Sequence, residues 1–358
     1  MPEFPIGGLW PQIVSPEGLY AAYLRARLGK RYRPEVAGFS LRLEPQLHAL
    51  RRSLRDGSYR PGPFRTFTIY ERKPRVISAA PFRDRVVHHA LMNAVEPIID
   101  PTFHPGSFAC RAGKGVHAAI DRYQRFARRY AYVMKLDIRR YFPSVDHAIL
   151  EAQLARRLAE PEVRALFHWI IASWHDPEDA YVLHPGDDLL TPLTRPRGLP
   201  IGNLTSQFLA NLYLDDFDHE VAADPRTGGY IRYVDDMVLF ADSKTDLWAL
   251  RERITELLGD LRLRLHPDKV FVTRTVCKVD FLGYQLTGRR RWLRPDSGRR
   301  FERRLRGMAA AYRRGEASLE DIRPSLQGWL GHARHGESTG LRRQIFKRIV
   351  MVKGAGRA

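Results

Sequence analysis

Cysteine, lysine and long apolar stretches are all scarce in this sequence of 358 residues. Its two cysteines, Cys110 and Cys277, are too few for a disulfide scaffold or a zinc knuckle. No apolar run reaches the roughly 18 residues that a transmembrane helix needs, so we expect no membrane partner. The first residues lack the charged segment and apolar run of a secretory signal, and we therefore expect a cytoplasmic protein.

Acidic residues are also in deficit. Asp and Glu number 40 against 59 Lys and Arg, which gives a formal net charge of +19. Arginine supplies 50 of the cations and lysine only nine. A GC-rich genome explains part of the arginine content, but it does not explain the net charge. A polyanionic partner is indicated, and the planar guanidinium suits phosphate contacts.

The charge is unevenly distributed along the chain. Residues 1–135 carry a net +13, residues 136–285 a net −7, and residues 286–358 a net +13. A protein that only binds nucleic acid has no evident need for an acidic centre. An enzyme that holds metal ions against a polyanion does need one.

The hydrophobic periodicity predicts a mixed α+β fold with no βαβ rhythm and no internal repeat. Hairpins are expected at 64–79 and 230–241, and strands at 132–138, 270–273 and 279–286. Residues 174–198 are polar and contain proline, which indicates an inserted loop. Helices are expected at 16–30, 41–56, 83–95, 205–221 and 245–258, and the last segment is expected to be helical with a run of arginines.

Two of the expected strands end in acids. Asp235 and Asp236 lie at the tip of the hairpin at 230–241, and Asp137 ends the apolar strand at 132–138. Carboxylates buried in such surroundings are costly unless a cation is present, although an ordinary solvated turn remains an alternative for the hairpin alone. Acids on two neighbouring strands can hold two Mg²⁺ ions, with Mn²⁺ as a substitute, for phosphoryl transfer.

A glycine-containing turn forms a third element. Gly198, Pro200 and Gly202 precede the expected helix at 205–221, and Asn203 or Thr205 could cap that helix. Such a turn lets the backbone approach a ligand closely. A simple connection between a loop and a helix is the alternative interpretation.

The order and spacing of these elements resemble those of a reverse transcriptase. Residues 233–236 (Tyr-Val-Asp-Asp) resemble its catalytic hairpin, residues 135–137 its first metal-binding motif, residues 81–86 a fingers motif, and residues 281–284 the primer grip. The resemblance implies a right-hand polymerase fold with an antiparallel palm sheet and a helical thumb. The expected domains are fingers at 1–135, palm at 136–285 and thumb at 286–358.

Three segments narrow the resemblance to the reverse transcriptases of diversity-generating retroelements. They are residues 107–115, 198–207 (Gly-Leu-Pro-Ile-Gly-Asn-Leu-Thr-Ser-Gln) and 325–332. That family copies a template RNA with errors opposite adenines and uses a small basic accessory protein. A retron, group II intron or phage-defence reverse transcriptase of ordinary fidelity remains an alternative, as does a non-catalytic RNA-binding relative.

The resemblance also implies roles for the acidic residues. Asp137 and Asp235 are expected to bind two Mg²⁺ ions together with the backbone carbonyl of Ile138, while Asp236 assists. Primer, template RNA, the RNA–DNA duplex and dNTPs are the expected partners.

Five further positions are implied to contact the incoming nucleotide. Phe142 falls at the steric gate that excludes a ribose 2′-hydroxyl, Arg75 at a position that contacts the triphosphate, and Lys269 near the pyrophosphate. Ile201, with Gly202 beside it, replaces an amide that normally supports the nucleotide. Since an apolar side chain cannot form those hydrogen bonds, base selection is expected to be loose.

Two basic segments are candidate nucleic-acid contacts. Residues 289–314 contain eleven arginines, and a helix there presents Arg299, Arg300, Arg303 and Arg304 to the template–primer duplex. A solvated face, or one that binds the accessory protein, is the alternative. Residues 111–115 lack the spacing of a phosphate-binding P-loop, and we expect Arg111 and Lys114 to contact template RNA.

Overall fold

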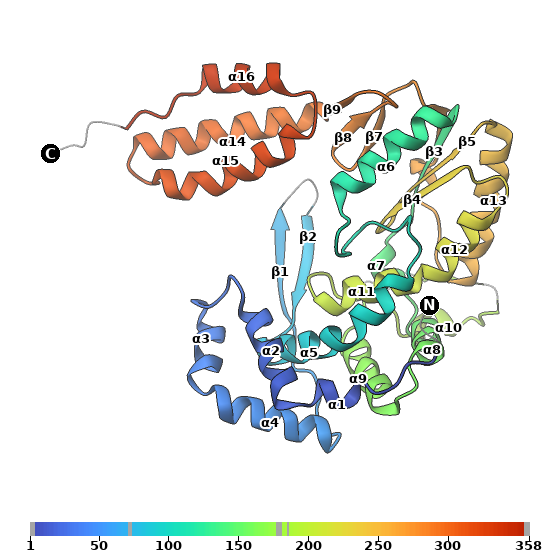
Figure 1. Ribbon diagram of the computed structural model, residues 1–358, viewed down its shortest axis with the longest axis vertical. Helices are drawn as coiled ribbons and strands as arrows, with labels where there is room; N and C mark the ends of the chain where they lie inside the picture. The colour runs from blue at the N-terminus through green and yellow to red at the C-terminus, as the bar shows by residue number, and fades with distance from the viewer. Residues whose placement is uncertain (1–3, 71–73, 177–180, 185, 354–358) are drawn as a thin grey trace.

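A computed structural model describes residues 4–70, 74–176, 181–184 and 186–353. Figure 1 shows helices α1–α5 and the hairpin β1–β2 on one side, a central sheet on the other, and three C-terminal helices above the tip of the hairpin. None of the described helices is long and apolar enough to cross a membrane.

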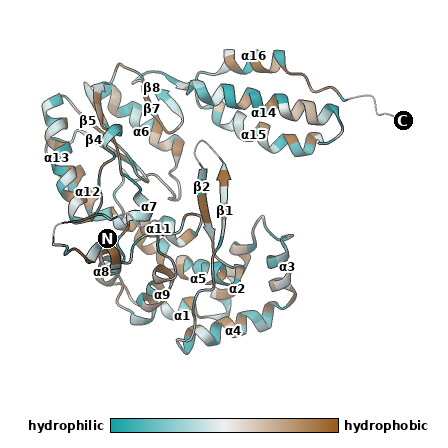
Figure 2. Ribbon diagram, turned by 180° about the vertical axis from the view of Figure 1, so that it is seen from behind, coloured by the Kyte–Doolittle hydropathy of each residue, from teal (hydrophilic) through white to brown (hydrophobic). Residues whose placement is uncertain are grey.

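The N-terminal part is helical around one long hairpin. Strands β1 (Arg65–Tyr70) and β2 (Pro74–Ala79) pair antiparallel, as predicted, with Phe67 opposite Ile77. Figure 2 shows hydrophobic residues in both strands, and two of these residues, Phe67 and Val76, are exposed. The helices are α1 (Trp10–Ile13), α2 (Pro16–Arg27), α3 (Pro34–Leu41), α4 (Leu43–Arg55) and α5 (Phe82–Ile99), of which α1 and α3 were not expected from the sequence.

A four-stranded antiparallel sheet forms the palm, with the order β4-β5-β3-β6. The strands are β3 (Tyr132–Asp137), β4 (Gly229–Tyr233), β5 (Asp236–Ala241) and β6 (Phe271–Arg274). Strand β3 therefore lies in the middle of the sheet, next to the hairpin β4–β5. This arrangement confirms that the two acid-bearing elements are neighbours.

Buried hydrophobic residues cover both faces of the palm sheet. Successive side chains of a strand point to opposite faces, so each strand contributes to two cores. Met134 and Leu239 join the main core, whereas Val133 and Phe240 pack into a second core. That second core includes α6 (Val116–Arg129) and a small sheet of β7 (Val279–Phe281), β8 (Tyr284–Leu286) and β9 (Arg291–Leu293). Burial on both faces fixes the register of β3, and with it the position of Asp137.

Short helices surround the sheet and connect its strands. They are α7 (Tyr141–Ser144), α8 (His147–Arg157), α9 (Pro161–Ala172), α10 (Thr191–Thr194), α11 (Leu204–Tyr213), α12 (Asp215–Ala223) and α13 (Lys244–Asp260), with 3₁₀ turns η1 (Asp100–Thr102) and η2 (Pro267–Lys269). The expected single helix at 205–221 was wrong: it is divided at Leu214 into α11 and α12. Asp215, Asp216 and Asp218 in the first turn of α12 favour a new helix N-terminus there.

Three helices form the C-terminal part: α14 (Pro295–Arg313), α15 (Leu319–Arg334) and α16 (Thr339–Arg348). The ring of Phe301 stacks on that of Trp329 with 3.9 Å between centroids, and Leu305 and Ile345 are buried beside them. The apolar faces of the three helices therefore form a small core of their own.

The expected domain limits at 135/136 and 285/286 pass through strands β3 and β8. They remain a prediction. In the expected insertion at 174–198, the described residues are irregular apart from α10. The single strand expected at 279–286 was also wrong. It is a hairpin, because Leu282 and Gly283 both adopt positive φ and turn the chain.

Candidate active site

The palm sheet places the three predicted acids together. Asp137 lies directly opposite Asp236 in the pairing of β3 with β5, and only 7% of Asp137 is exposed. The amide of Ile138 donates a hydrogen bond of 3.1 Å to the carbonyl oxygen of Asp235. The segment after β3 is therefore joined directly to the turn of the hairpin.

The hairpin turn is strained at Val234, whose φ is 60°. A β-branched residue is an outlier in this region and needs support from its surroundings. Arg232 provides that support, because its Nη1 donates a hydrogen bond of 3.1 Å to the carbonyl oxygen of Val234. Arg232 also forms two bonds of 2.6 and 2.7 Å with Asp218, and both side chains are fully buried.

Sequence reasoning missed this supporting ion pair. Its signal was a charged residue, Arg232, in the middle of an otherwise apolar strand, together with a cluster of acids at 215–218. A buried charge needs an opposite charge as its partner. The phenol of Tyr230 completes the arrangement by donating 2.6 Å to Asp218 Oδ1.

Two lysines balance two of the three carboxylates. Lys269 Nζ lies 2.7 Å from Asp137 Oδ1, and Lys135 Nζ lies 3.3 Å from Asp236 Oδ1. Lys269 thus contacts an expected metal ligand. Lys135 was not singled out from the sequence, although the alternation of a strand places it on the same face as Asp137.

Asp235 is the carboxylate without such a partner. No cation among the described residues forms an ion pair with it. Its burial, followed by repulsion from Asp137 and then from Asp236, raises the pKa of Asp235 to about 6. The negative charge of an ionised Asp235 is therefore not balanced by an ion pair with any described residue.

This donor set fits a divalent cation that shares its ligands with a substrate. Within the described ranges, no three His, Cys, Asp or Glu side chains make a metal site complete in itself. Mg²⁺, however, is usually held by one or two carboxylates, water and substrate phosphates. Asp137, Asp235 and the backbone carbonyl of Ile138 would supply the hard oxygen ligands.

The raised pKa of Asp235 predicts a pH effect on stability in EDTA. An unfolded Asp loses its proton near pH 4, whereas the folded Asp235 keeps it up to about pH 6. The folded state therefore binds more protons across this interval, and the contribution of Asp235 to stability falls as the pH rises. Relative to the wild type, Asp235→Asn should gain about 1–3 kcal/mol in unfolding free energy between about pH 4 and pH 7. Urea titrations at both pH values measure the gain, and an unchanged difference would contradict the prediction.

The turn at 198–203 links the palm to the hairpin β1–β2. On one side, the amide of Leu199 donates 2.9 Å to the carbonyl oxygen of Phe142. On the other, the carbonyl of Ile201 accepts 3.0 Å from the amide of Ser78. These bonds join Phe142 and the turn that carries Ile201 into one wall, formed by residues 142 and 198–203. The same turn is bonded to β2.

Asn203 fastens the same turn from within. Its side chain donates 2.8 Å to the carbonyl of Ser78 and accepts 3.1 Å from the amide of Ala80. Asn203 occupies the N-cap position of α11 as expected, but its side chain makes no capping bond there. The side chain connects two segments instead of ending a helix.

Gly202 is required by the space beside β2. Its φ is 113°, and a Cβ at this position would lie 2.7 Å from Cγ2 of Ile77. Arg75 lies two residues from Ile77 on the same strand, so it belongs to the same face of β2, and it is exposed. The structure therefore places Arg75 on the face of β2 that lies against the turn at 198–203.

Arg111 and Lys114 both bind the protein's own backbone. Arg111 is buried, pairs with Asp100 at 2.9 Å and donates to the carbonyls of His104 and Ser107. Lys114 Nζ donates 2.9 Å to Ser107 and to Pro105, and burial lowers its pKa to about 8. The expectation that both residues contact template RNA stays a prediction, and in this structure their donors bind the backbone of residues 100–107.

The expected arginines of the thumb are accessible. Arg299, Arg300, Arg303 and Arg304 are exposed on α14, and Arg300 lies 3.4 Å from Asp296. Their exposure is compatible with contacts to phosphates, which remain a prediction.

Comparisons with known proteins agree with this geometry. Residues 66–286 match the family described as "Reverse transcriptase (RNA-dependent DNA polymerase)". Protein YkfC of Escherichia coli is 27% identical over 289 residues, which cover 70% of this chain and 73% of YkfC. The group II intron-encoded protein LtrA of Lactococcus lactis is 21% identical over 336 residues. That alignment covers 75% of this chain and 54% of LtrA, so the chain spans about half the length of LtrA.

Among solved structures, apo telomerase from Candida tropicalis, truncated from the C-terminal domain, aligns with a TM-score of 0.45 and 12% identity. The alignment covers 66% of this chain and 56% of the telomerase chain. The family match over more than half of the sequence, with the observed order of elements, confirms the α+β right-hand polymerase fold. The chain belongs to the reverse transcriptase family, the RNA-dependent DNA polymerases.

Proposed function

We propose that this reverse transcriptase copies a template RNA into cDNA by nucleotidyl transfer at Asp137, Asp235 and Asp236, with frequent errors at template adenines. The observation that carries the catalytic part is the uncompensated carboxylate of Asp235 beside Asp137. A protein that only bound RNA would gain nothing from a buried acid facing a polyanion. The error-prone part rests on the resemblance to diversity-generating retroelements and on Ile201.

The acids and the lysines have separate roles in this proposal. Asp137 and Asp235 would hold two Mg²⁺ ions, with Asp236 assisting from the opposite strand. Mg²⁺, when bound, lowers the pKa of the primer 3′-hydroxyl and stabilises the leaving pyrophosphate. Lys269 would leave Asp137 and turn to the phosphates, since its side chain is nearly half exposed. Arg75 adds a guanidinium from the side of β2.

The wall formed by residues 142 and 198–203 is proposed to select the nucleotide. Phe142 would place its ring against C2′ of the incoming sugar, which favours dNTPs over NTPs. Gly202 would let the backbone approach the nucleotide. Ile201 lies beside them without a polar group in its side chain, so base pairing alone would discriminate among dNTPs.

The fidelity proposal predicts that Ile201→Gln lowers misincorporation opposite template adenines. An amide restores hydrogen bonds that an apolar side chain cannot make, and we expect the error frequency to fall by roughly tenfold. Sequencing of cDNA made on a defined RNA template measures the effect. Val276→Gln, which changes an exposed apolar residue between β6 and β7, serves as the matched control.

The same experiment tests the second candidate function. The similarity to LtrA favours a reverse transcriptase of the group II intron kind, for which ordinary fidelity is expected. A wild-type error spectrum without excess at adenines would support that candidate and reject the diversity-generating one. An unchanged excess in Ile201→Gln would remove Ile201 from the explanation.

The proposal includes two further partners and a location. The arginines of α14 would contact the RNA–DNA duplex, and a small basic accessory protein would assist synthesis. We place the enzyme in the cytoplasm, where its two cysteines stay reduced.

A further inference from the structure

Tyr141 is the buried neighbour of the proposed steric gate, Phe142. Only 2% of Tyr141 is exposed, whereas Phe142 is partly buried and stays at the wall of the site. The chain turns sharply just before them, at Arg140, whose φ of 49° lies in the left-handed region where α7 begins. A large polar side chain is therefore placed in the core directly beside the gate.

The phenol of Tyr141 has a specific partner there. It donates a buried hydrogen bond to the carbonyl oxygen of Ala210, in the last turn of α11. The last four carbonyls of a helix have no donor within the helix. In a longer helix the amide of Leu214 would donate to Ala210, but here it bonds to the carbonyl of Leu212. The phenol of Tyr141 therefore takes the place of the helix amide at this carbonyl.

The phenol keeps its proton in this position. Burial raises the pKa of Tyr141 well above its usual value, and the negative charge of Asp235 in the hairpin turn acts in the same direction. Tyr141 is therefore a hydrogen-bond donor at any pH at which primers are extended.

The ring of Tyr141 also contacts the ring of Phe142. Their centroids lie 5.7 Å apart and their planes meet at 63°, which is an edge-to-face arrangement. Aromatic rings attract each other in this geometry beyond the effect of buried area alone. The ring of Tyr141 thus supports the ring of Phe142 from the core.

Three hydrogen bonds fix the segment from Ile138 to Phe142. The amide of Ile138 donates to the carbonyl oxygen of Asp235, and the carbonyl of Phe142 accepts from the turn at 198–203. The phenol of Tyr141 adds a bond to α11, the helix that begins directly after this turn. The segment is therefore joined to the catalytic turn at one end and to the turn at 198–203 and its helix at the other.

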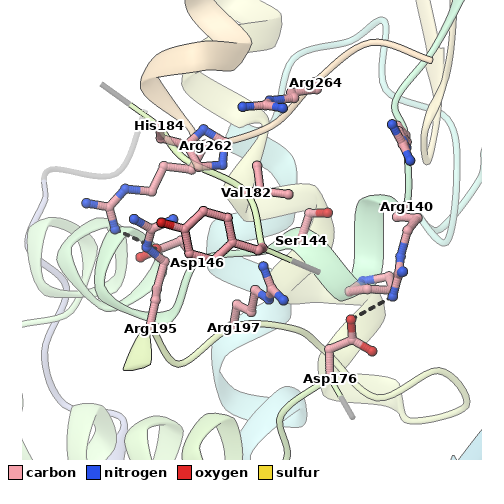
Figure 3. Close-up of a pocket in the computed structure, with 13 residues that line it drawn as sticks. Arg140, Ser144, Asp146, Asp176, Val182, His184, Arg195, Arg197, Arg262 and Arg264 are labelled. Carbon is pink, nitrogen blue, oxygen red and sulfur yellow. Dashed lines mark hydrogen bonds and ion pairs between the residues drawn. The ribbon is translucent and has the colours of Figure 1, made fainter. Parts of the chain in front are cut away.

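The opposite side of the same segment borders a cavity of about 270 Å³. Figure 3 shows Arg140 and Ser144, which flank the segment and helix α7, beside this cavity. A polar cavity of this size can hold water. Water gives way more easily than packed side chains, so the contacts of Tyr141 on the core side decide where Phe142 lies.

We propose that Tyr141 is a positioning residue for sugar selection, whose phenol, bonded to Ala210, holds the ring of Phe142 against C2′ of the incoming nucleotide. This role rests on the proposed function of Phe142 as the steric gate. Without the phenol, the ring of Phe142 is free to tilt, and a ribose 2′-hydroxyl is excluded less strongly. Tyr141 is buried and acts through Phe142, so its loss should affect the choice between sugars more than the rate with dNTPs.

The test uses three variants of the full chain. Y141F removes only the phenol oxygen and keeps the ring. Y23F is the matched control, because Tyr23 is equally buried, its phenol lies 2.7 Å from Oγ of Ser40, and its ring stacks on that of Phe39. F142V removes the ring of the gate itself.

Single-nucleotide extension of a DNA primer on a defined RNA template gives kcat/KM for the matching dNTP and for the matching rNTP. The ratio of the two values measures sugar selection, which a general loss of stability does not change. Thermal unfolding of each variant establishes that it is folded, and all assays are run below the unfolding transition of the least stable one.

We expect Y141F to lower the ratio roughly fivefold, which corresponds to the loss of one buried hydrogen bond. Y23F should keep the wild-type ratio, and F142V should lower the ratio further than Y141F does. If F142V lowers the ratio while Y141F gives the same ratio as Y23F, the positioning role of Tyr141 is overturned and the gate stands. If F142V keeps the wild-type ratio, the gate role of Phe142 fails, and the role of Tyr141 fails with it.

Discussion

Asp235→Asn should abolish primer extension on an RNA template while leaving the fold intact. The change keeps the size of the side chain but removes the one of the three clustered carboxylates that forms no ion pair with a described residue. Metal assistance contributes several kcal/mol to such transfers, so we expect a loss of roughly 10³-fold or more in rate. Single-turnover extension of a DNA primer with Mg²⁺ and dNTPs measures the loss.

A matched change at the other end of the same strand controls for this experiment. Asp242 follows β5 directly, and its carboxylate accepts 3.0 Å from the amide of Ala131 on the surface. Asp242→Asn removes the same charge far from the catalytic turn and should extend primers at nearly the wild-type rate. Wild-type activity in Asp235→Asn would contradict the assignment of the active site, and equal losses in both variants would point to a general effect of charge.

Arg232→Met should unfold the protein at a much lower urea concentration than the wild type. The substitution leaves Asp218 buried without a cation, and such losses cost about 3–5 kcal/mol. Equilibrium unfolding followed by tryptophan fluorescence gives the difference. Arg232→Met should also lower primer-extension activity, because Arg232 donates a hydrogen bond to the carbonyl oxygen of Val234 in the hairpin turn.

An exposed ion pair provides the comparison. Arg253 lies 3.4 Å from Glu220, and both side chains are about half exposed. Arg253→Met should cost less than about 1 kcal/mol, since solvent screens that pair. The double variant Arg232→Met with Asp218→Leu should recover part of the stability, because apolar side chains can replace a buried pair. If Arg232→Met is no more destabilising than Arg253→Met, the buried ion pair of Arg232 with Asp218 does not have the stabilising role assigned to it.

The clustering of the three acids could be predicted from the sequence because their signal is local. Asp137, Asp235 and Asp236 each interrupt a short apolar run, and their strands are the strongest β patterns in the chain. The wall at Phe142 and Ile201 was expected only through resemblance. No local pattern shows that the carbonyls of both residues accept bonds from distant amides.

Arg111 and Lys114 show why basic motifs are less informative. The sequence places two cations beside two glycines, which is compatible with a surface that binds phosphates. The structure uses the same cations to hold a loop, since they donate to the carbonyl oxygens of His104, Pro105 and Ser107. Only the three-dimensional path of the loop decides which acceptor lies closest to a guanidinium.

The sequence by itself therefore determined most of the strands and helices, the acids and the family, because each of these depends on residue types at short spacing. The tertiary structure decided how the charges are compensated, because partners such as Arg232 with Asp218 and Lys269 with Asp137 lie 14 and 132 residues apart. Among the described residues it left Asp235 without an ion pair, and it lined one cavity with six arginines. The scarcity of acids in the composition gave no indication of either feature, since a total charge contains no distances.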